Sequence, residues 1–192
     1  DYVFDGEQSF AYKQTDATNP INLYGLSKLK GEEAVRELCE KHIILRVSSV
    51  FSPYGNNFVK TILRLATERE TLKIIADQQH CPTSASSIAL SLSIIIENLS
   101  NKAWGTYHYC DSPSTTWFDF SQRIIELGNQ YRKLKTSHIQ PISSIEFNAL
   151  AKRPRYSVLN CDSIKSVFGI SQSCWDKKLE GIIRDCFERR VL

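Results

Sequence analysis

Tyr24 and Lys28 are the residues of this sequence whose types and spacing suit proton transfer. They lie four positions apart in residues 19–33 (NPINLYGLSKLKGEE), and side chains at i and i+4 project from one face of a helix. A free phenol has a pKa of ~10, and a neighbouring ammonium favours the phenolate. Such a pair can exchange a proton with a carbonyl or alcohol oxygen near neutral pH, and the ammonium can also bind ribose hydroxyls.

The spacing Tyr-x-x-x-Lys alone is weak evidence, because a half-buried tyrosine beside a snorkelling lysine gives the same pattern. The elements around it are more informative. An extended run at residues 2–4 closes at the turn signal Asp5-Gly6, and a polar loop at 7–19 leads into a helix at 21–41. Its apolar residues recur at helical spacing, which predicts a buried face. These residues are Leu26, Leu29, Ala34, Val35 and Leu38.

Residues 42–50 (HIILRVSSV) are a continuous apolar run with a polar end, which is typical of a strand buried in a parallel sheet. The order strand, helix, strand favours a βαβ unit. Ligands bind at the carboxyl ends of such strands, where Ser48 and Ser49 lie. The remaining pattern predicts strands at 72–76, 105–110 and 138–142, a polar loop at 77–83, and helices at 56–70, 85–99, 116–130 (capped by Thr115), 162–168 and 175–190.

The composition is that of an ordinary globular protein: 192 residues, 42% hydrophobic, 23% charged and a net charge of +3. We expect no nucleic-acid partner, because no run of like charge occurs, and no membrane span, because no apolar run reaches ~18 residues. The six cysteines have no zinc-ligand spacing. They indicate reduced thiols, no metal site and a cytoplasmic location.

The eight glycines include no dinucleotide-binding fingerprint between a strand and a helix. If the protein uses a dinucleotide, we expect its phosphate-binding half upstream of Asp1. The sequence then predicts an α/β fold with an incomplete Rossmann-like parallel sheet, its N-terminal βαβ units lying outside this chain, and a smaller α/β substrate-binding lobe. We assign residues 1–55 and 84–110 to the dinucleotide-binding domain, and 56–83 and 111–192 to the lobe.

Several segments occur in an order that resembles one family. They are DYVFDG, NPINLYGLSKLKGEE, ILRVSSVF, NNFVKTILRLA, DQQHCPT, GTYHYC, TTWFDF and RPRYSVL. This order resembles the extended short-chain dehydrogenase/reductases, and within them the dTDP-4-dehydrorhamnose reductase family. The resemblance covers nearly the whole chain. Tyr-x-x-x-Lys is generic for the superfamily, whereas the combination of the other segments is specific to the rhamnose branch.

The resemblance implies that NADPH or NADH reduces the 4-keto group of a nucleotide-sugar substrate, dTDP-4-dehydro-L-rhamnose. It makes Tyr24 the proton donor and Lys28 its electrostatic partner and ribose ligand. The family's third catalytic hydroxyl would precede Asp1, so we expect this chain alone to be an inactive fragment. Substrate-binding candidates are Asp1, Ser49, Asn57 and Arg153. Mg²⁺ and a homodimer are further implications of the family.

Two positions depart from the family pattern. Ser49 stands where the family often has tryptophan, and His80 stands where it usually has glycine, so the loop around His80 is expected to take another path. Two alternatives stay open: a non-catalytic regulatory subunit of the methionine adenosyltransferase type, and a nucleotide-sugar epimerase or dehydratase. For His108 and the aromatic residues 117–120 we expect places in the core. Asn57 also fits a helix cap, and Arg155 a solvated basic turn.

Overall fold

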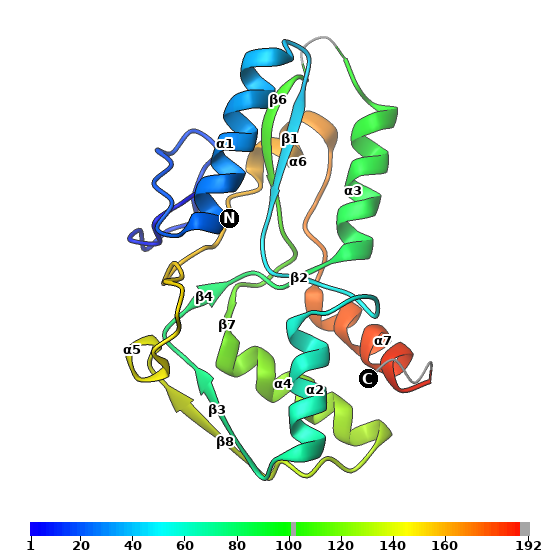
Figure 1. Cartoon of the computed structure of the whole chain (residues 1–192). Coiled ribbons are helices and arrows are strands. Elements are labelled where there is room, and N and C mark those ends of the chain that lie inside the picture. Colours follow the sequence, from blue (N-terminus) through cyan, green and yellow to red (C-terminus); the bar gives the residue numbers. More distant parts are fainter. Residues whose placement is uncertain (101–102, 189–192) are drawn as a thin grey trace.

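The structure is a computed structural model that describes residues 1–100 and 103–188. Figure 1 shows an upper part built on β1 and β6 and a lower part built on β3 and β8. The helices are α1 Leu23–Leu38, α2 Phe58–Glu68, α3 Ala85–Glu97, α4 Trp117–Tyr131, α5 Ser144–Phe147, α6 Asp162–Phe168 and α7 Trp175–Glu188. The strands are β1 Ile43–Val47, β2 Val50–Phe51, β3 Thr71–Ile75, β4 Gln79–His80, β5 Thr83–Ser84, β6 Gly105–Tyr109, β7 Thr115–Thr116 and β8 His138–Ile142.

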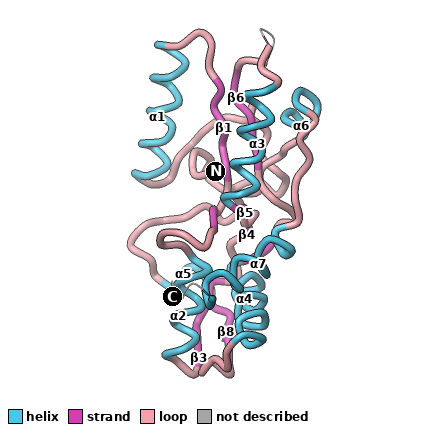
Figure 2. The backbone as a smooth tube through the Cα atoms, turned by 90° about the vertical axis from the view of Figure 1, so that its right-hand side faces the viewer, coloured by secondary structure: helices cyan, strands magenta, loops and turns pink. Residues whose placement is uncertain are grey.

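The parallel pairing expected from the βαβ order is present. β1 pairs with β6 in parallel, with Arg46 opposite His108 and Val47 opposite Tyr109. In Figures 1 and 2, α1 and α3 lie on opposite sides of this pair, and α6 packs beside β6. The fold class predicted from the sequence, α/β with a parallel Rossmann-like sheet, is therefore confirmed.

Three further strand pairs complete the sheet structure. β3 and β8 form a second parallel pair, β2 pairs with β5 in parallel, and β4 pairs with β7 antiparallel. Residues 77–83, predicted to be a polar loop, thus contain β4 and the start of β5, because their backbone groups pair with segments distant in sequence. The α4 cap is Thr116 rather than Thr115, since its hydroxyl accepts from the amide of Asp119.

Two hydrophobic clusters hold the elements together. One contains α2, α4 and α7 side chains around Phe120 and Leu179. The other surrounds Phe4, Tyr109 and Ile164. Our division into a domain and a lobe stays a prediction. Residues 158–170, which we assigned to the lobe, pack in the same cluster as side chains of β6, which we assigned to the domain. The predicted core places of Phe120 and His108 are confirmed, with exposures of 1% each.

Two predictions at the N-terminal end were wrong. Residues 2–4 form a turn rather than a strand, because the Phe4 amide donates to the Asp1 carbonyl at 3.2 Å. The predicted apolar face of α1 is largely exposed: Leu26 is 41% and Leu38 81% accessible, whereas Gly25 and Glu32 are the buried residues of this helix. Helical spacing identifies the residues that share a face but not what packs against it.

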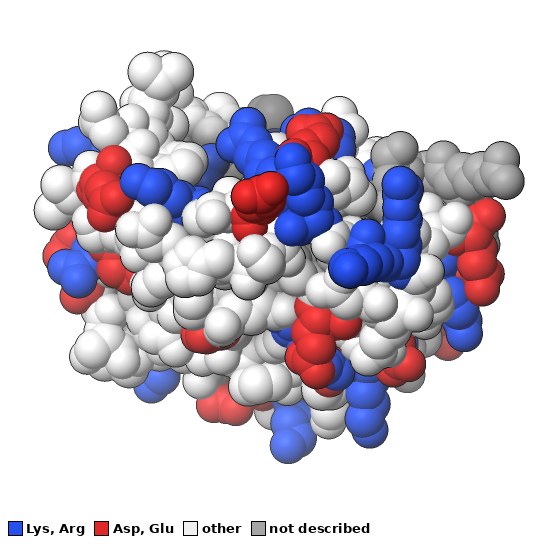
Figure 3. Space-filling view, turned by 90° about the horizontal axis from the view of Figure 1, so that it is seen from below, with Lys and Arg blue, Asp and Glu red and all other residues white. Residues whose placement is uncertain are grey.

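Charged side chains of both signs are interspersed on the lower face of the molecule (Figure 3). Among the described helices, none is long and apolar enough to cross a membrane. The predicted reduced state of the cysteines agrees with the structure, in which all six are free. Cys110 and Cys161 have buried sulfur atoms 3.7 Å apart.

Candidate active site

The first turn of α1 places Tyr24 beside Lys28. Asn22 begins the helix: its backbone is extended, and its Oδ1 accepts from the Gly25 amide at 2.8 Å, which is an N-cap bond. The Lys28 Nζ lies 5.2 Å from the centre of the Tyr24 ring, within the range of a cation–π contact. Tyr24 is 60% exposed. The shared face expected from the sequence is therefore present, with both groups accessible to a ligand.

Tyr2 forms the wall behind Tyr24. Its ring meets the Tyr24 ring edge-on, with 5.9 Å between centroids. The backbones also meet closely, because a Cβ atom added to Gly25 would lie 2.1 Å from the Tyr2 carbonyl oxygen. Burial raises the pKa of Tyr2, and the positive charge of Arg153 partly offsets this rise. The turn at residues 1–4 thus connects the Tyr24 helix to the neighbourhood of Arg153.

Tyr24 and Lys28 line a pocket of about 340 Å³, here called the Lys28 pocket. Asp1 is also in its wall and is fixed at the carboxyl end of β1. Its backbone nitrogen donates to the Val47 carbonyl at 3.0 Å, and its Oδ2 accepts from the Ser48 hydroxyl at 2.9 Å. The predicted candidates Asp1, Tyr24 and Lys28 are therefore brought together.

A buried ion pair in the wall of this pocket anchors α1 to β1. Both Glu32 carboxylate oxygens accept from the Arg46 guanidinium, at 2.8 and 2.7 Å, and Arg36 donates to Glu32 at 2.7 Å. Burial alone would raise the pKa of Glu32, but the hydrogen bonds and charges of Arg46 and Arg36 outweigh it, so the pKa is lowered. Glu32 lies one turn beyond Lys28, so this anchor sets the distance of the Tyr24–Lys28 face from β1.

His108 completes the anchor. Its Nε2 lies 3.3 Å from Arg46 NH1, and its Nδ1 lies 3.0 Å from the Tyr12 carbonyl oxygen. Because a guanidinium only donates and a carbonyl only accepts, the ring is neutral with its proton on Nδ1. Burial, followed by the positive charge of Arg46, lowers the pKa of His108 to about 4, which agrees with this form.

A second pocket, the Arg153 pocket, has a volume of about 530 Å³ and includes Tyr2, Tyr24 and Arg153. Tyr24 and Tyr2 thus belong to the walls of both pockets. The turn that carries Arg153 is tied to the start of α1, because Asn22 Nδ2 donates to the Lys152 carbonyl at 2.8 Å.

A glycine contact fixes the other side of the same turn. Gly6 has a φ of +86°, and a Cβ there would lie 2.6 Å from the Pro154 side chain. Only glycine combines this left-handed backbone with so close an approach at little steric cost. The DYVFDG segment therefore touches both the Tyr24 helix, through Tyr2, and the Arg153 turn, through Gly6.

Ser49 and Asn57 are the candidates that lie apart. Among the described residues, neither is in the walls of the two Tyr24 pockets. Ser49 follows β1 as predicted and has a φ of +39°, a left-handed conformation that is unfavourable for serine. Asn57 is the N-cap of α2: its Oδ1 accepts from the Lys60 amide at 3.2 Å, and its Nδ2 donates to the Ser52 carbonyl at 2.8 Å. The cap interpretation of Asn57 is confirmed.

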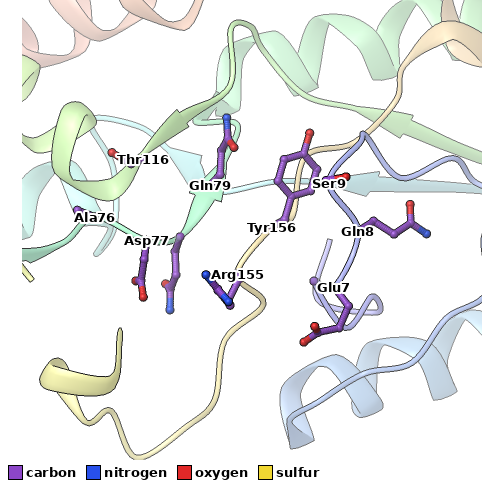
Figure 4. A pocket seen from close by; sticks show the side chains of 11 residues that line it. Glu7, Gln8, Ser9, Ala76, Asp77, Gln79, Thr116, Arg155 and Tyr156 are labelled. Atoms are coloured by element: carbon purple, nitrogen blue, oxygen red, sulfur yellow. The ribbon is translucent and has the colours of Figure 1, made fainter. Parts of the chain in front are cut away.

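A third pocket of about 420 Å³ lies where β4 meets residues 155–156 and the loop at 7–9. Figure 4 shows the Arg155 side chain directed toward Asp77, with Glu7 on the opposite side. Asp77 is already engaged, because both of its carboxylate oxygens accept from the Ser144 amide and hydroxyl at 2.7–3.0 Å. Its wall combines polar side chains such as Gln8 and Gln79 with Ala76 and Tyr156, and Tyr24 is not part of it.

His80 lies in the core and not in the walls of the three pockets described above. It is 2% exposed, and its ring stacks on Trp117 with 3.7 Å between centroids. Burial lowers its pKa to about 3, so the ring is neutral. Its φ is not positive, so the backbone at this position does not need glycine. Trp117 is partly buried and packs against the core rather than within it.

Among the described residues, no group of three or more His, Cys, Asp or Glu side chains is placed to hold a metal ion. The structure gives no support for the Mg²⁺ suggested by resemblance.

Sequence reasoning missed Tyr2, Asn22 and the Glu32–Arg46 pair. Asn22 carried a signal, since asparagine before an apolar helix is a good cap. The Glu32–Arg46 contact depends on how α1 packs on β1, and no local pattern indicated it.

The fold and the Tyr24 helix define the class: a Rossmann-like α/β protein with a Tyr-x-x-x-Lys pair beside a pocket. Within this class the chain belongs to the family described as the RmlD substrate binding domain, whose model matches residues 1–187. The chain is 40% identical over 186 residues to dTDP-4-dehydrorhamnose reductase of Aggregatibacter actinomycetemcomitans, an alignment that covers 95% of this chain and 63% of that protein.

Solved structures agree with this assignment. A dTDP-4-dehydrorhamnose reductase of Bacillus anthracis, solved in complex with NADP, has a TM-score of 0.85 and 35% identity over 96% of this chain and 63% of its own. An orthologous reductase of Clostridium acetobutylicum has a TM-score of 0.87 and 33% identity over 95% and 62%. The chain thus spans somewhat less than two thirds of the length of these proteins.

Proposed function

We propose that this chain carries the proton-donating and substrate-binding groups of a reductase that converts dTDP-4-dehydro-L-rhamnose to dTDP-L-rhamnose with NADPH or NADH. One observation carries the proposal. The Tyr24 side chain belongs to the walls of two adjoining pockets, of which one contains Lys28 and the other Arg153. A dinucleotide beside Lys28 and a nucleotide sugar beside Arg153 would then meet at the tyrosine hydroxyl.

The reaction assigned to these residues is the reduction of a ketone. A bound reduced nicotinamide supplies the hydride to the carbonyl carbon. Tyr24 donates its proton to the carbonyl oxygen, which becomes the new hydroxyl, and Lys28 stabilises the negative charge that the proton leaves on the tyrosine oxygen. Lys28 is exposed in the pocket wall and has ammonium donors for the ribose hydroxyls, so the residues present fit the cofactor.

Arg153 is the candidate for the substrate diphosphate, because a guanidinium binds phosphate oxygens through two parallel hydrogen bonds. Asp1, at the carboxyl end of β1, is proposed to contact the sugar. Ser49 and Asn57 stay as candidates at the edge of the substrate site, with Asn57 acting through the α2 cap. A cytoplasmic location and a homodimer belong to the same proposal.

The test is a Tyr24→Phe variant of the complete product of the gene that encodes this chain. Removing the acid should lower kcat about 10²–10⁴-fold while the Kd for dTDP changes less than about twofold. Tyr131→Phe, which alters an exposed tyrosine stacked on Phe187 far from both pockets, is the matched control and should retain full activity. Full activity in Tyr24→Phe, or no reduction of the keto-sugar by the wild type, would refute the proposal.

A further inference from the structure

Asn22 uses the two ends of its side-chain amide for different purposes. The oxygen accepts from the Gly25 amide and caps α1, whereas the nitrogen donates to the carbonyl of Lys152, 130 residues away, at 2.8 Å. The first bond caps the helix that carries Tyr24. The second binds the residue directly before Arg153. One side chain therefore joins the two functional segments of the site.

Residues 144–152, here called the strap, are held by polar contacts at both ends. The bond between Asn22 and Lys152 is the contact at one end. At the other end, the Ser144 amide and hydroxyl donate to Asp77 at 2.7–3.0 Å. Between these anchors the strap carries exposed apolar side chains: Ile145 is 89% accessible, and Leu150 is fully accessible. Exposed side chains contribute little packing energy, so the polar anchors hold the strap in place.

The strap forms pocket walls on both sides of Arg153. Leu150 lines the Arg153 pocket together with Tyr24. Ile145 lines a neighbouring pocket of about 410 Å³, which also includes Arg153 and Lys152. Movement at the Lys152 end would therefore displace the arginine and two ligand-facing walls at once. The Ser144 end is held by four contacts. At the other end, the Asn22 amide holds the residue before Arg153, while the Gly6 approach to Pro154 and the bond from the Gln79 amide to the Arg155 carbonyl hold the residues after it.

From this arrangement we propose that Asn22 is a positioning residue that sets the place of Arg153 relative to Tyr24. It does not touch the reacting atoms. It fixes the distance between the proton donor and the group that holds the anionic part of the ligand, and it does so from the helix cap itself. The inference rests on the proposed function for its ligand, a nucleoside diphosphate. The bond from Asn22 to the Lys152 carbonyl, here called the tether, can be tested without turnover.

The decisive variant is Asn22→Ser, made in the complete gene product. Serine caps helices about as well as asparagine, so α1 should keep its start, but the short hydroxyl cannot reach Lys152. We expect Tm to change by less than about 3 °C, because the cap survives. The Kd for dTDP and the KM for the keto-sugar should both rise about three- to tenfold, with kcat within about twofold.

Asn98→Ser is the matched control. Asn98 also uses its Nδ2 to donate to a backbone carbonyl, that of Ile94, at 2.8 Å in an exposed setting, but it ends α3 and lies in neither Tyr24 pocket. Its replacement should leave Kd and KM unchanged. Asn22→Asp keeps a cap oxygen and loses the donor, so it supplies the same comparison if the serine variant is unstable.

Hydrogen exchange provides the readout that does not need a ligand. The Gln79 amide, which donates to the Arg155 carbonyl at 2.8 Å, should exchange faster in Asn22→Ser than in the wild type, and at the wild-type rate in Asn98→Ser. Unchanged exchange with unchanged Kd would overturn the tether. A wild type that binds dTDP without reducing the keto-sugar would overturn the proposed function alone, with the tether then judged from Kd and exchange.

Discussion

The Gly25 backbone lies against the Tyr2 carbonyl so closely that no side chain fits between them. This contact brings the turn at residues 1–4 to the first turn of α1, where Tyr24 stands. It also explains the glycine of the segment Tyr-Gly-x-Ser-Lys in physical terms. The helix would be more stable with another residue there, so the glycine serves the approach of the two segments.

Gly25→Ala tests this contact. The added methyl group must push Tyr2 and α1 apart, and overpacking of this kind costs about 3 kcal/mol. We expect urea unfolding to show that loss, and kcat/KM to fall about 10²-fold because Tyr24 is displaced. Gly31→Ala in the same helix meets no atom within 4 Å and should raise stability by about 0.5–1 kcal/mol. Equal behaviour of the two variants would argue against a steric role for Gly25.

Glu32→Gln should break the anchor between α1 and β1. The substitution keeps the size of the side chain but leaves the buried Arg46 charge without its carboxylate, which costs about 3–5 kcal/mol. Glu33→Gln is the matched control, because Glu33 pairs with the exposed Lys30 and such surface pairs contribute about 0–1 kcal/mol. Chemical denaturation of both variants measures the difference. A loss below about 1 kcal/mol in Glu32→Gln would contradict the anchoring role.

The low pKa of His80 leads us to expect that the free energy of unfolding falls in acid. Its pKa is about 3 in the folded protein and ~6.5 when unfolded, so between these values the unfolded chain binds a proton that the folded chain does not. Stability from this group is therefore complete above pH 6.5 and falls as the pH drops, by about 2 kcal/mol between pH 7 and pH 5. His80→Phe keeps the stacking on Trp117 and should flatten the pH dependence of urea unfolding by that amount. An unchanged slope would show that His80 titrates normally.

Ser49→Gly should stabilise the protein. Serine holds a left-handed backbone here, which costs about 1–2 kcal/mol for a residue with a side chain, and glycine recovers part of it. We expect a gain of about 0.5–1 kcal/mol in the free energy of unfolding. Ser49→Ala removes only the hydroxyl and leaves the strain, so it should give no gain. If both variants gain equally, the effect belongs to the hydroxyl and not to the backbone.

Local signals in the sequence were enough to predict most elements. The caps Asn57 and Ser84 and the αL terminator Gly169 mark ends of helices by bonds within a few residues. The Tyr24–Lys28 face follows from helix geometry in the same way. These features need no knowledge of distant residues.

Features that depend on distant pairing could not be predicted. The Glu32–Arg46–His108 anchor requires the β1–β6 register. The strand expected at residues 2–4 failed because a strand needs partners, whereas a turn satisfies the Phe4 amide locally. The Asn22–Lys152 bond joins residues 130 positions apart, and nothing near either of them indicates it.

The contact between Gly6 and Pro154 has a consequence for the exchange of segments between relatives. A chimera that receives only residues 152–155 of a relative would place different atoms against Gly6. The Gly6 backbone already lies in close contact with Pro154, so a bulkier turn would clash with it. Residues 1–6, 22–25 and 152–155 interlock through two glycines and one amide. They should therefore be exchanged together, as one unit, in any chimera of this chain with a relative.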